Sequence, residues 1–218
     1  ADASLPEAVA AAADGGVIEL ADGEHACEIA VSGALTIRAL ADGSATLVQA
    51  KLASSAIILR DGAELRLDGV SLRGQPGGSQ AALIAVNDSS LYARNSNLTN
   101  APGVAISAEG DASRIELQGS TVSGAGGNGV ELRTGASLDV RNSRIVENAK
   151  SGVFAAAAGC TIALTGNSEL SRNQICGVQA SGQASVTLRN SAVIANGEGG
   201  LVVAGAGSAL DVDSSRVS

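Results

Sequence analysis

Short segments in which apolar and polar residues alternate recur along most of this chain. In residues 137–141, Leu138 and Val140 are apolar, whereas Ser137, Asp139 and Arg141 are polar. The same alternation surrounds four other pairs of aliphatic residues: Ile115/Leu117, Ile162/Leu164, Val186/Leu188 and Leu210/Val212. An apolar residue at every second position is typical of a β-strand with one buried side. The pattern therefore predicts many short strands separated by turns.

Two landmarks repeat in step along the chain. A glycine before an aliphatic residue recurs, with spacings of 26, 23, 25 and 23 residues, at Gly103, Gly129, Gly152, Gly177 and Gly200. A dipeptide ending in serine recurs every 23 to 25 residues, at Asn95-Ser96, Gly119-Ser120, Asn142-Ser143, Asn167-Ser168, Asn190-Ser191 and Ser214-Ser215. A fixed repeat of this length indicates a solenoid, because one coil alone cannot bury its apolar side.

Each repeat holds three short strands, and equivalent strands of successive repeats run in the same direction. We therefore predict an all-β fold, a right-handed parallel β-helix with three sheets and about nine coils. Stacking the coils about 4.8 Å apart lets each strand form hydrogen bonds with the coils on either side. Residues 1–218 are expected to form one domain, with irregular first coils over residues 17–55 and regular coils over residues 56–218.

An N-terminal capping α-helix is predicted within residues 1–16. Ser4 and Glu7 have the spacing of a capping box, Pro6 suits the first turn, and Gly15 and Gly16 end the helical run. Such a helix can cover the apolar end of the first coil.

The C-terminal end has no comparable cap in the sequence, which stops at Ser218 just after a strand position. An uncovered end would expose apolar side chains and unpaired strand edges. We therefore expect that the native chain is longer or that another molecule covers this end.

One turn of the repeat carries asparagine in four coils: Asn95, Asn142, Asn167 and Asn190. Asparagine tolerates the left-handed backbone conformation of a tight corner, and its amide can form hydrogen bonds along a stack. We interpret these residues as a structural asparagine ladder. A shorter ladder is predicted through Asn148, Asn173 and Asn196.

The composition argues against several classes of partner. The chain has 22 Asp and Glu against 14 Lys and Arg, a net charge of -8. Nucleic acids and anionic membranes are bound through clustered basic residues, so neither is an expected partner. No apolar run is long enough to span a membrane. The three cysteines, Cys27, Cys160 and Cys176, form no metal-binding motif, and we expect no cofactor. We favour a secreted, periplasmic or cell-surface location in a bacterium.

The opening of the chain resembles a known superfamily. The resemblance rests on Leu5-Pro6-Glu7-Ala8-Val9, on residues 16–23, on Leu35-Thr36-Ile37-Arg38, and on the repeated Asn-Ser and Gly-Val dipeptides. These elements are similar to those of the pectate-lyase-like right-handed β-helices, in particular members with generic β-helix repeats. The resemblance implies the fold. It leaves function open, because the superfamily includes lyases, hydrolases, epimerases, phage tailspikes and non-catalytic repeat domains.

The catalytic signatures of that superfamily are largely missing here. Polygalacturonase-like members use clustered aspartates with a histidine, and the one histidine, His25, lies in the irregular N-terminal part. Pectate lyases use acidic calcium ligands and an arginine base on the outer face of the strand that follows the glycine landmark. We expect that face to present one carboxylate and no arginine, through Ile58, Ile84, Ala105, Glu131, Phe154, Gln179 and Val202.

The next strand of each coil should present a more polar outer face. Its central row is predicted to read Arg66, Tyr92, Glu116, Asp139, Ala163, Thr187 and Asp211. A row beside it should read Asp68, Arg94, Gln118, Arg141, Thr165, Arg189 and Asp213. We interpret the mixed charges as cross-strand pairs on a solvated surface, with a polar binding groove as the alternative. A Ca²⁺ site at Asp211 and Asp213 is a further, weaker hypothesis.

Two functions compete on this evidence. The favoured hypothesis is a non-catalytic scaffold that binds a protein or associates with itself through an apolar row, Ile58, Ile84, Phe154 and Val202, or through the open C-terminal end. The alternative is a polysaccharide-active enzyme (a lyase, hydrolase or epimerase) or a glycan-binding domain. Its best acid–base candidates lie on one coil: Glu131, Arg133, Asp139 and Arg141. Of the two hypotheses, we favour the non-catalytic one over an enzyme.

Overall fold

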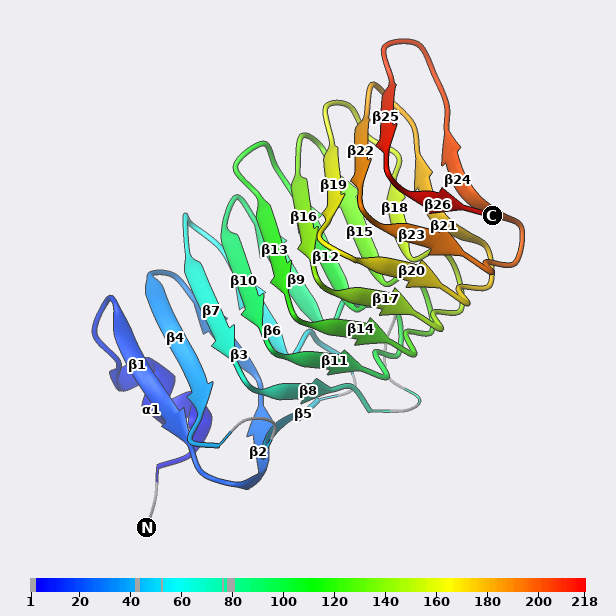
Figure 1. The fold of residues 1–218 in the computed structure, drawn as a ribbon. Helices are drawn as coiled ribbons and strands as arrows, with labels where there is room; N and C mark the ends of the chain where they lie inside the picture. The colour runs from blue at the N-terminus through cyan, green and yellow to red at the C-terminus, as the bar shows by residue number, and fades with distance from the viewer. Residues whose placement is uncertain (1–2, 42–43, 52, 76, 78–80) are drawn as a thin grey trace.

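The computed structural model describes residues 3–41, 44–51, 53–75, 77 and 81–218. In these residues the chain forms a single α-helix, α1 (Leu5–Ala11), followed by 26 short strands that wind into a stack of coils (Figure 1). Equivalent strands of successive coils pair in parallel and build three sheets that run the length of the stack. The predicted three-sheet parallel β-helix is therefore confirmed.

The three sheets take every third strand. Sheet A contains β1 (Gly16–Leu20), β4 (Ala34–Ala39), β7 (Glu64–Asp68), β10 (Ser90–Arg94), β13 (Arg114–Gln118), β16 (Ser137–Arg141), β19 (Thr161–Thr165), β22 (Ser185–Arg189) and β25 (Ala209–Asp213). Sheet B contains β2 (Gly23–Cys27), β5 (Ala45–Gln49), β8 (Ser71–Arg73), β11 (Asn97–Thr99), β14 (Thr121–Ser123), β17 (Arg144–Val146), β20 (Glu169–Ser171), β23 (Ala192–Ile194) and β26 (Arg216–Val217). Sheet C contains β3 (Ile29–Val31), β6 (Ile57–Leu59), β9 (Ile84–Asn87), β12 (Ile106–Glu109), β15 (Val130–Arg133), β18 (Val153–Ala155), β21 (Cys176–Ala180) and β24 (Gly199–Val203).

The described strands make eight coils with all three sides and a ninth with two, β25 and β26, which agrees with the predicted number. Residues 17–55, which we expected to be irregular, supply five strands that join the same three sheets in register, with β1 pairing β4 and β2 pairing β5. The first coils therefore follow the same winding as the rest.

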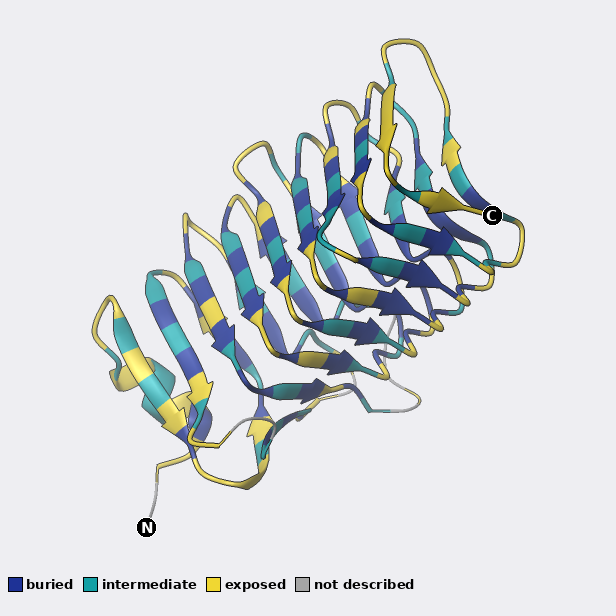
Figure 2. Ribbon diagram, viewed as in Figure 1, coloured by how far each residue is buried: buried dark blue, intermediate teal, exposed yellow. Residues whose placement is uncertain are grey.

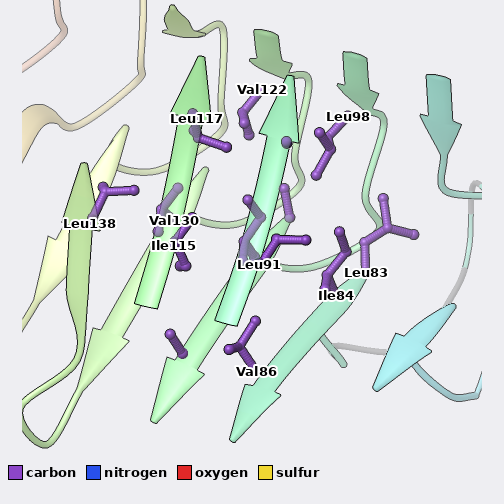
Figure 3. Packing of buried hydrophobic residues seen from close by; sticks show 14 of the residues in the cluster. Leu83, Ile84, Val86, Leu91, Leu98, Ile115, Leu117, Val122, Val130 and Leu138 are labelled. Carbon is purple, nitrogen blue, oxygen red and sulfur yellow. The ribbon is translucent and has the colours of Figure 1, made fainter. Parts of the chain in front are cut away.

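The core is a set of aliphatic rows along the axis of the stack. In sheet A, Leu91 pairs with Ile115 and Ile115 pairs with Leu138, and each is at most 2% exposed. Figure 3 shows such side chains from all three sheets lying together between the strands. Burying one aliphatic side chain of this size stabilises the fold by about 1.5–3 kcal/mol, so the rows supply most of the driving force.

The exposed asparagines at the corner between sheets A and B have the predicted backbone conformation but do not form the predicted ladder. Their φ angles, 48°, 49°, 65° and 49°, are left-handed at Asn95, Asn142, Asn167 and Asn190. Their side chains are exposed, and in the described part of the chain no hydrogen bond joins their amides. The stack is held here by the buried serine that follows each corner: the Ser96 N–H donates to Ser120 Oγ over 3.1 Å.

A true amide ladder follows sheet B in the later coils, at the shorter ladder that the sequence predicts. Asn148 Nδ2 donates to Asn173 Oδ1 over 2.8 Å, and Asn173 Nδ2 donates to Asn196 Oδ1 over 3.0 Å. Asn148 and Asn173 are at most 1% exposed. These amides also accept backbone hydrogen bonds; the N–H of Ala125, for example, donates to Asn148 Oδ1. The polar groups of this turn are thereby satisfied inside the stack.

Helix α1 is shorter than predicted but packs where predicted. It ends at Ala11, and Ala12 is already extended. The Glu7 carboxylate accepts hydrogen bonds from Ser4 N and Oγ over 2.9 and 2.8 Å, which closes the capping box and lowers the pKa of Glu7. Leu5 is 6% exposed, and the helix contacts β2 and β3 at the beginning of the stack.

Exposure is greatest at the two ends of the stack (Figure 2). Every residue of β25 and β26 is exposed, and the large apolar side chains Leu210, Val212 and Val217 are 42–49% exposed. Both strands lie at the end of their sheets, with a coil on one side. The whole last coil therefore lacks the cover that the inner coils give to one another.

All three cysteines are buried and free. Burial raises the pKa of the Cys27 thiol to about 12 and raises the pKa of Cys160 and of Cys176. The three thiols therefore pack as small buried residues of the core.

Candidate functional site

The outer face of sheet A has the two rows that the sequence predicts. Strand pairing aligns Arg66 with Tyr92 and Tyr92 with Glu116 in the central row. In the row beside it, Arg94 lies between Asp68 and Gln118. Alternation along each strand turns these side chains outward while their neighbours fill the core.

A hollow lies on this face around Tyr92. Its volume is about 290 Å³, and its polar walls come from Thr36, Arg66, Asp68, Tyr92, Arg94, Glu116 and Gln118. Leu67 and Ala93, which point inward, form the floor. Four neighbouring strands of the sheet, β4, β7, β10 and β13, contribute to it.

Tyr92 is held in place by an arginine. The Arg66 guanidinium carbon lies 4.6 Å from the centre of the Tyr92 ring, which is within range of a cation–π interaction. Glu64 in turn accepts hydrogen bonds from Arg66 Nε and Nη2 over 2.9 and 2.6 Å. One face of the ring is therefore occupied, and the ring cannot stack on a ligand from that side.

Arg94 is the second cation of this hollow, beside Arg66, and its side chain is exposed. In the described part of the chain it has no ion-pair partner, whereas most arginines of the protein have one within 4.0 Å. Its five N–H donors are therefore free to bind a ligand. Such a planar donor set can bind a carboxylate through two parallel hydrogen bonds.

The predicted acid–base cluster is not assembled. Glu131 and Arg133 lie on β15 in sheet C, whereas Asp139 and Arg141 lie on β16 in sheet A. Each acid binds the arginine of its own strand: Arg133 Nη2 lies 2.7 Å from Glu131 Oε1, and Arg141 Nε lies 3.0 Å from Asp139 Oδ1. The four residues lie on one coil as predicted, but the turn between the strands places the two pairs on different faces.

The two arginines of this set are also poorly suited to accept a proton. The hydrogen bond to Glu131 raises the pKa of Arg133, and the hydrogen bond to Asp139 raises the pKa of Arg141. Both guanidinium groups stay protonated, and their role here is to bind the acids.

The predicted apolar row on sheet C needs a correction at Ile84. Ile84 pairs with Ile57 and is fully buried, and it is Ala85 that pairs with the outward Ile58. A shift of one residue moves a side chain to the other side of a strand. Ala105, predicted in the same row, is also fully buried, because Ile106 pairs with Val130 and Ser107 takes the position beside Glu131.

The corrected outer row of sheet C is not continuously apolar. It reads Ala30, Ile58, Ala85, Ser107, Glu131, Phe154, Gln179 and Val202. Phe154 thus lies between Glu131 and Gln179, and Val202 is 41% exposed at the end of the row. Single apolar side chains of this kind are ordinary on a protein surface.

The suggested calcium ligands are engaged by an arginine. Arg189 Nη2 lies 2.7 Å from Asp211 Oδ2, and Arg189 Nη1 lies 3.9 Å from Asp213 Oδ2. Among the described residues, no group of three or more His, Cys, Asp or Glu side chains is arranged to hold a metal ion.

Two other features of the surface belong to the fold. His25 Nε2 lies 2.8 Å from the carbonyl oxygen of Ala21 in the first coil. A groove of about 630 Å³ separates α1 from β3, and its walls include Val9, Ala13 and Val31. None of the described helices is long and apolar enough to cross a membrane.

Sequence reasoning placed Tyr92 and Arg94 in adjacent rows but did not single them out. The available signal was the register: once β7, β10 and β13 are aligned, the protein's one tyrosine lies between Arg66 and Glu116. That Arg94 lacks an acidic partner depends on side-chain positions, which the row pattern does not give.

Comparison with known proteins identifies a matching family and proteins of similar fold. Residues 81–218 match the family described as right handed beta helix region. The PL6 family alginate lyase AlyGC has a similar structure, with a TM-score of 0.64 and 16% identity over 96% of this chain and 37% of that chain. The Azotobacter vinelandii mannuronan C-5 epimerase AlgE6 A-module aligns with a TM-score of 0.31 and 12% identity over 97% of this chain and 92% of that chain. No curated protein matches the sequence. The chain spans little more than a third of the length of AlyGC, and the likeness is one of fold.

Proposed function

This chain belongs to the right-handed β-helix family, and we propose that it binds a linear acidic polysaccharide along the outer face of sheet A without cleaving it. The observation that carries the proposal is the hollow around Tyr92, where Arg94 offers an unpaired guanidinium beside the ring. A sugar carboxylate can bind Arg94, while ring hydroxyls can reach Glu116 and Gln118 in the same hollow.

The distribution of charge supports an anionic ligand on this face. The protein carries a net charge of -8, and six of its twelve arginines point outward from sheet A: Arg38, Arg66, Arg94, Arg114, Arg141 and Arg189. Seven acids point outward from the same sheet: Glu19, Glu64, Asp68, Glu116, Asp139, Asp211 and Asp213. This face is therefore close to neutral, and the rest of the protein carries most of the net negative charge, so a polyanion meets less repulsion here than elsewhere.

The structural neighbour supports the chemical class of the ligand at the level of fold. AlyGC is an alginate lyase, and alginate is an acidic polysaccharide. A β-helix offers such a polymer a long, regular surface whose outward residues can change without disturbing the core.

Binding is favoured over cleavage by how the acids of this face are engaged. Glu64 binds Arg66, Glu116 lies 3.4 Å from Arg114 Nη2, and Asp139 binds Arg141. General acid–base catalysis needs two titratable groups that face the scissile bond and exchange protons. The paired charges named here suit recognition of a ligand, and Asp68 is the acid of the hollow that has no ion pair among the described residues.

Affinity for polygalacturonate and alginate, measured by titration calorimetry with neutral dextran as the negative control, tests the proposal. Arg94→Gln should weaken binding about twofold to fivefold, the range expected for one exposed ion pair. Arg133→Gln on sheet C removes the same charge from another face and should leave affinity unchanged. Equal losses in the two variants would show an effect of net charge alone.

The catalytic alternative has its own readout. After incubation with the same polymers, ultraviolet absorbance should detect no unsaturated sugar product. Unsaturated product that disappears in Glu131→Gln would contradict the binding proposal and favour a lyase.

Protein assembly through the outer face of sheet C is a second candidate, favoured by the exposure of Val202 and the outward position of Phe154. Light scattering after size exclusion, across a concentration series, tests it. A mass that rises with concentration and falls back in Phe154→Glu would support assembly. A constant mass would leave no role for this row.

A further inference from the structure

On the outer face of sheet A, the row beside the central row, which contains Arg94, has arginine at regular intervals. Following the register from β4 to β22, arginine stands in every second coil: Arg38, Arg94, Arg141 and Arg189. The coils between them carry Asp68, Gln118 and Thr165. Pairing of Leu164 with Leu188 places Thr165 beside Arg189 and completes the row.

This alternation sets a fixed spacing between cations. Neighbouring strands lie about 4.8 Å apart, so every second coil repeats at about 9.6 Å. The spacing comes from backbone hydrogen bonds on both sides of each strand and is therefore rigid. A flexible arginine side chain can adjust around its position, but the average repeat is fixed by the sheet.

An extended polysaccharide ribbon has a matching repeat. One 1,4-linked pyranose lengthens such a chain by about the spacing between two strands. In a two-fold ribbon, successive sugars turn their carboxylates to opposite sides, so every second carboxylate faces the same way. A ribbon lying along the stack would then place one carboxylate on each arginine of the row.

We infer that the row recognises a two-fold, 1,4-linked polyuronate ribbon that runs along the axis of the stack with one sugar per coil. This inference rests on the proposed function and adds the conformation and register of the ligand. Arg94 provides the anchor beside Tyr92. The other three arginines repeat the contact at two-coil intervals, so their contributions combine as in multivalent binding.

The ion pairs that three of these arginines make do not block the contact. Arg38 binds Glu19, Arg141 binds Asp139, and Arg189 binds Asp211. Their side chains are 49–53% exposed, and a guanidinium with five N–H donors can bind a second carboxylate.

The first test varies ligand length. Oligomers of β-1,4-linked glucuronate, from two to eight sugars, are titrated into the protein at low and at moderate salt. Affinity should rise in steps at every second sugar, and the gain should end near seven sugars, because the row from β4 to β22 covers seven strands. A smooth rise with length would overturn the inference.

The second test shifts the register at constant charge. The double substitution Arg94→Gln with Gln118→Arg moves one guanidinium to the neighbouring coil and leaves the composition of the row unchanged. It should lose as much affinity for the six-sugar ligand as Arg94→Gln alone, about twofold to fivefold. Thermal unfolding of both variants checks that the fold is intact.

The outcomes separate this inference from the proposed function. Tight binding by the register-shifted protein, equal to the unchanged protein, would show that charge suffices and would overturn the inference while polysaccharide binding stands. Failure of every acidic polymer to bind would overturn both. Poly-glutamate of matched charge should bind more weakly than the uronate oligomer, because its charges do not repeat on one side at the two-coil spacing.

Discussion

The interior of the coil stack and the outer face of sheet A are built on the same strands, yet they follow different rules. Inward positions repeat one class of residue: Leu91, Ile115 and Leu138 follow one another through three coils. Outward positions on the same strands change from coil to coil, from Tyr92 to Glu116 to Asp139. The interior is constrained by packing in every coil, whereas the outer face is free to carry recognition.

Information about function therefore lies in the pattern of outward residues. A parallel β-helix fixes the distance between coils, so a choice made at each outward position becomes a pattern with a fixed spacing. The arginines of sheet A follow such a pattern, whereas the outer row of sheet C mixes apolar, acidic and amide side chains.

The largest effect is expected in the interior, at Leu117. Leu117→Ala removes a fully buried side chain between two coils and should lower the free energy of unfolding by about 2–5 kcal/mol. Chemical denaturation measures the change. The outward neighbour Gln118→Ala should change it by less than about 0.5 kcal/mol. Similar losses at both positions would contradict the division between inward and outward residues.

A smaller loss is expected at Asn173 in the buried ladder. Asn173→Ala removes the Oδ1 acceptor that both the backbone N–H and the Nδ2 of Asn148 use inside the stack, and it removes the donor to Asn196 Oδ1. The free energy of unfolding should fall by about 1–3 kcal/mol. Asn173→Asp keeps an acceptor and loses one of the two amide N–H donors. At low pH, where the carboxyl is neutral, its stability should lie between that of the unchanged protein and that of the alanine variant. No loss in the alanine variant would show that the ladder does not stabilise the coils.

The exposed corner at Asn142 should respond to backbone conformation rather than to hydrogen bonding. Its φ of 49° is left-handed, and a residue with a Cβ and no local polar group pays about 1–2 kcal/mol there. Asn142→Ala should therefore destabilise by about 1 kcal/mol or slightly more, and Asn142→Gly should not. If both variants lose equally, the side-chain amide matters at this corner after all.

The pH dependence of stability should report the buried thiol of Cys27. Burial raises the pKa of Cys27 to about 12, whereas the thiol of the unfolded chain ionises near pH 9. Between these values the unfolded state loses its proton first, so stability is complete below about pH 9 and falls as pH rises. Relative to Cys27→Ala, the loss should reach about 1 kcal/mol at pH 10. Parallel pH profiles of the two proteins would contradict a buried thiol.

The smallest change in stability is expected at Arg94. Arg94→Gln removes an exposed cation that has no ion-pair partner among the described residues, so the free energy of unfolding should stay within about 0.5 kcal/mol. Its effect on polysaccharide affinity should be clear in the same protein. A large loss of stability would mean that Arg94 serves the fold and not a ligand.

The period-two pattern and the two landmarks suffice to predict the sheets, because every coil must bury the same side of its strands. They also predict the outward rows of sheet A, where strand residues follow directly from the alternation. They fail at Ile84, because the connection from β8 to β9 is longer than the equivalent connections of the later coils. Side-chain contacts such as that of Arg66 with Tyr92, and the split between Glu131 and Asp139, depend on the turns and could not be read from the pattern.

The most direct test of polysaccharide binding on sheet A is to follow the Nε–Hε resonances of the arginines by NMR while a six-sugar glucuronate is added. The protein, at 21.2 kDa, is small enough for this measurement. We expect the resonances of Arg38, Arg94, Arg141 and Arg189 to shift, whereas those of Arg133, Arg144 and Arg172 should stay in place. Shifts spread evenly over all these arginines, or confined to those on the other two sheets, would contradict it.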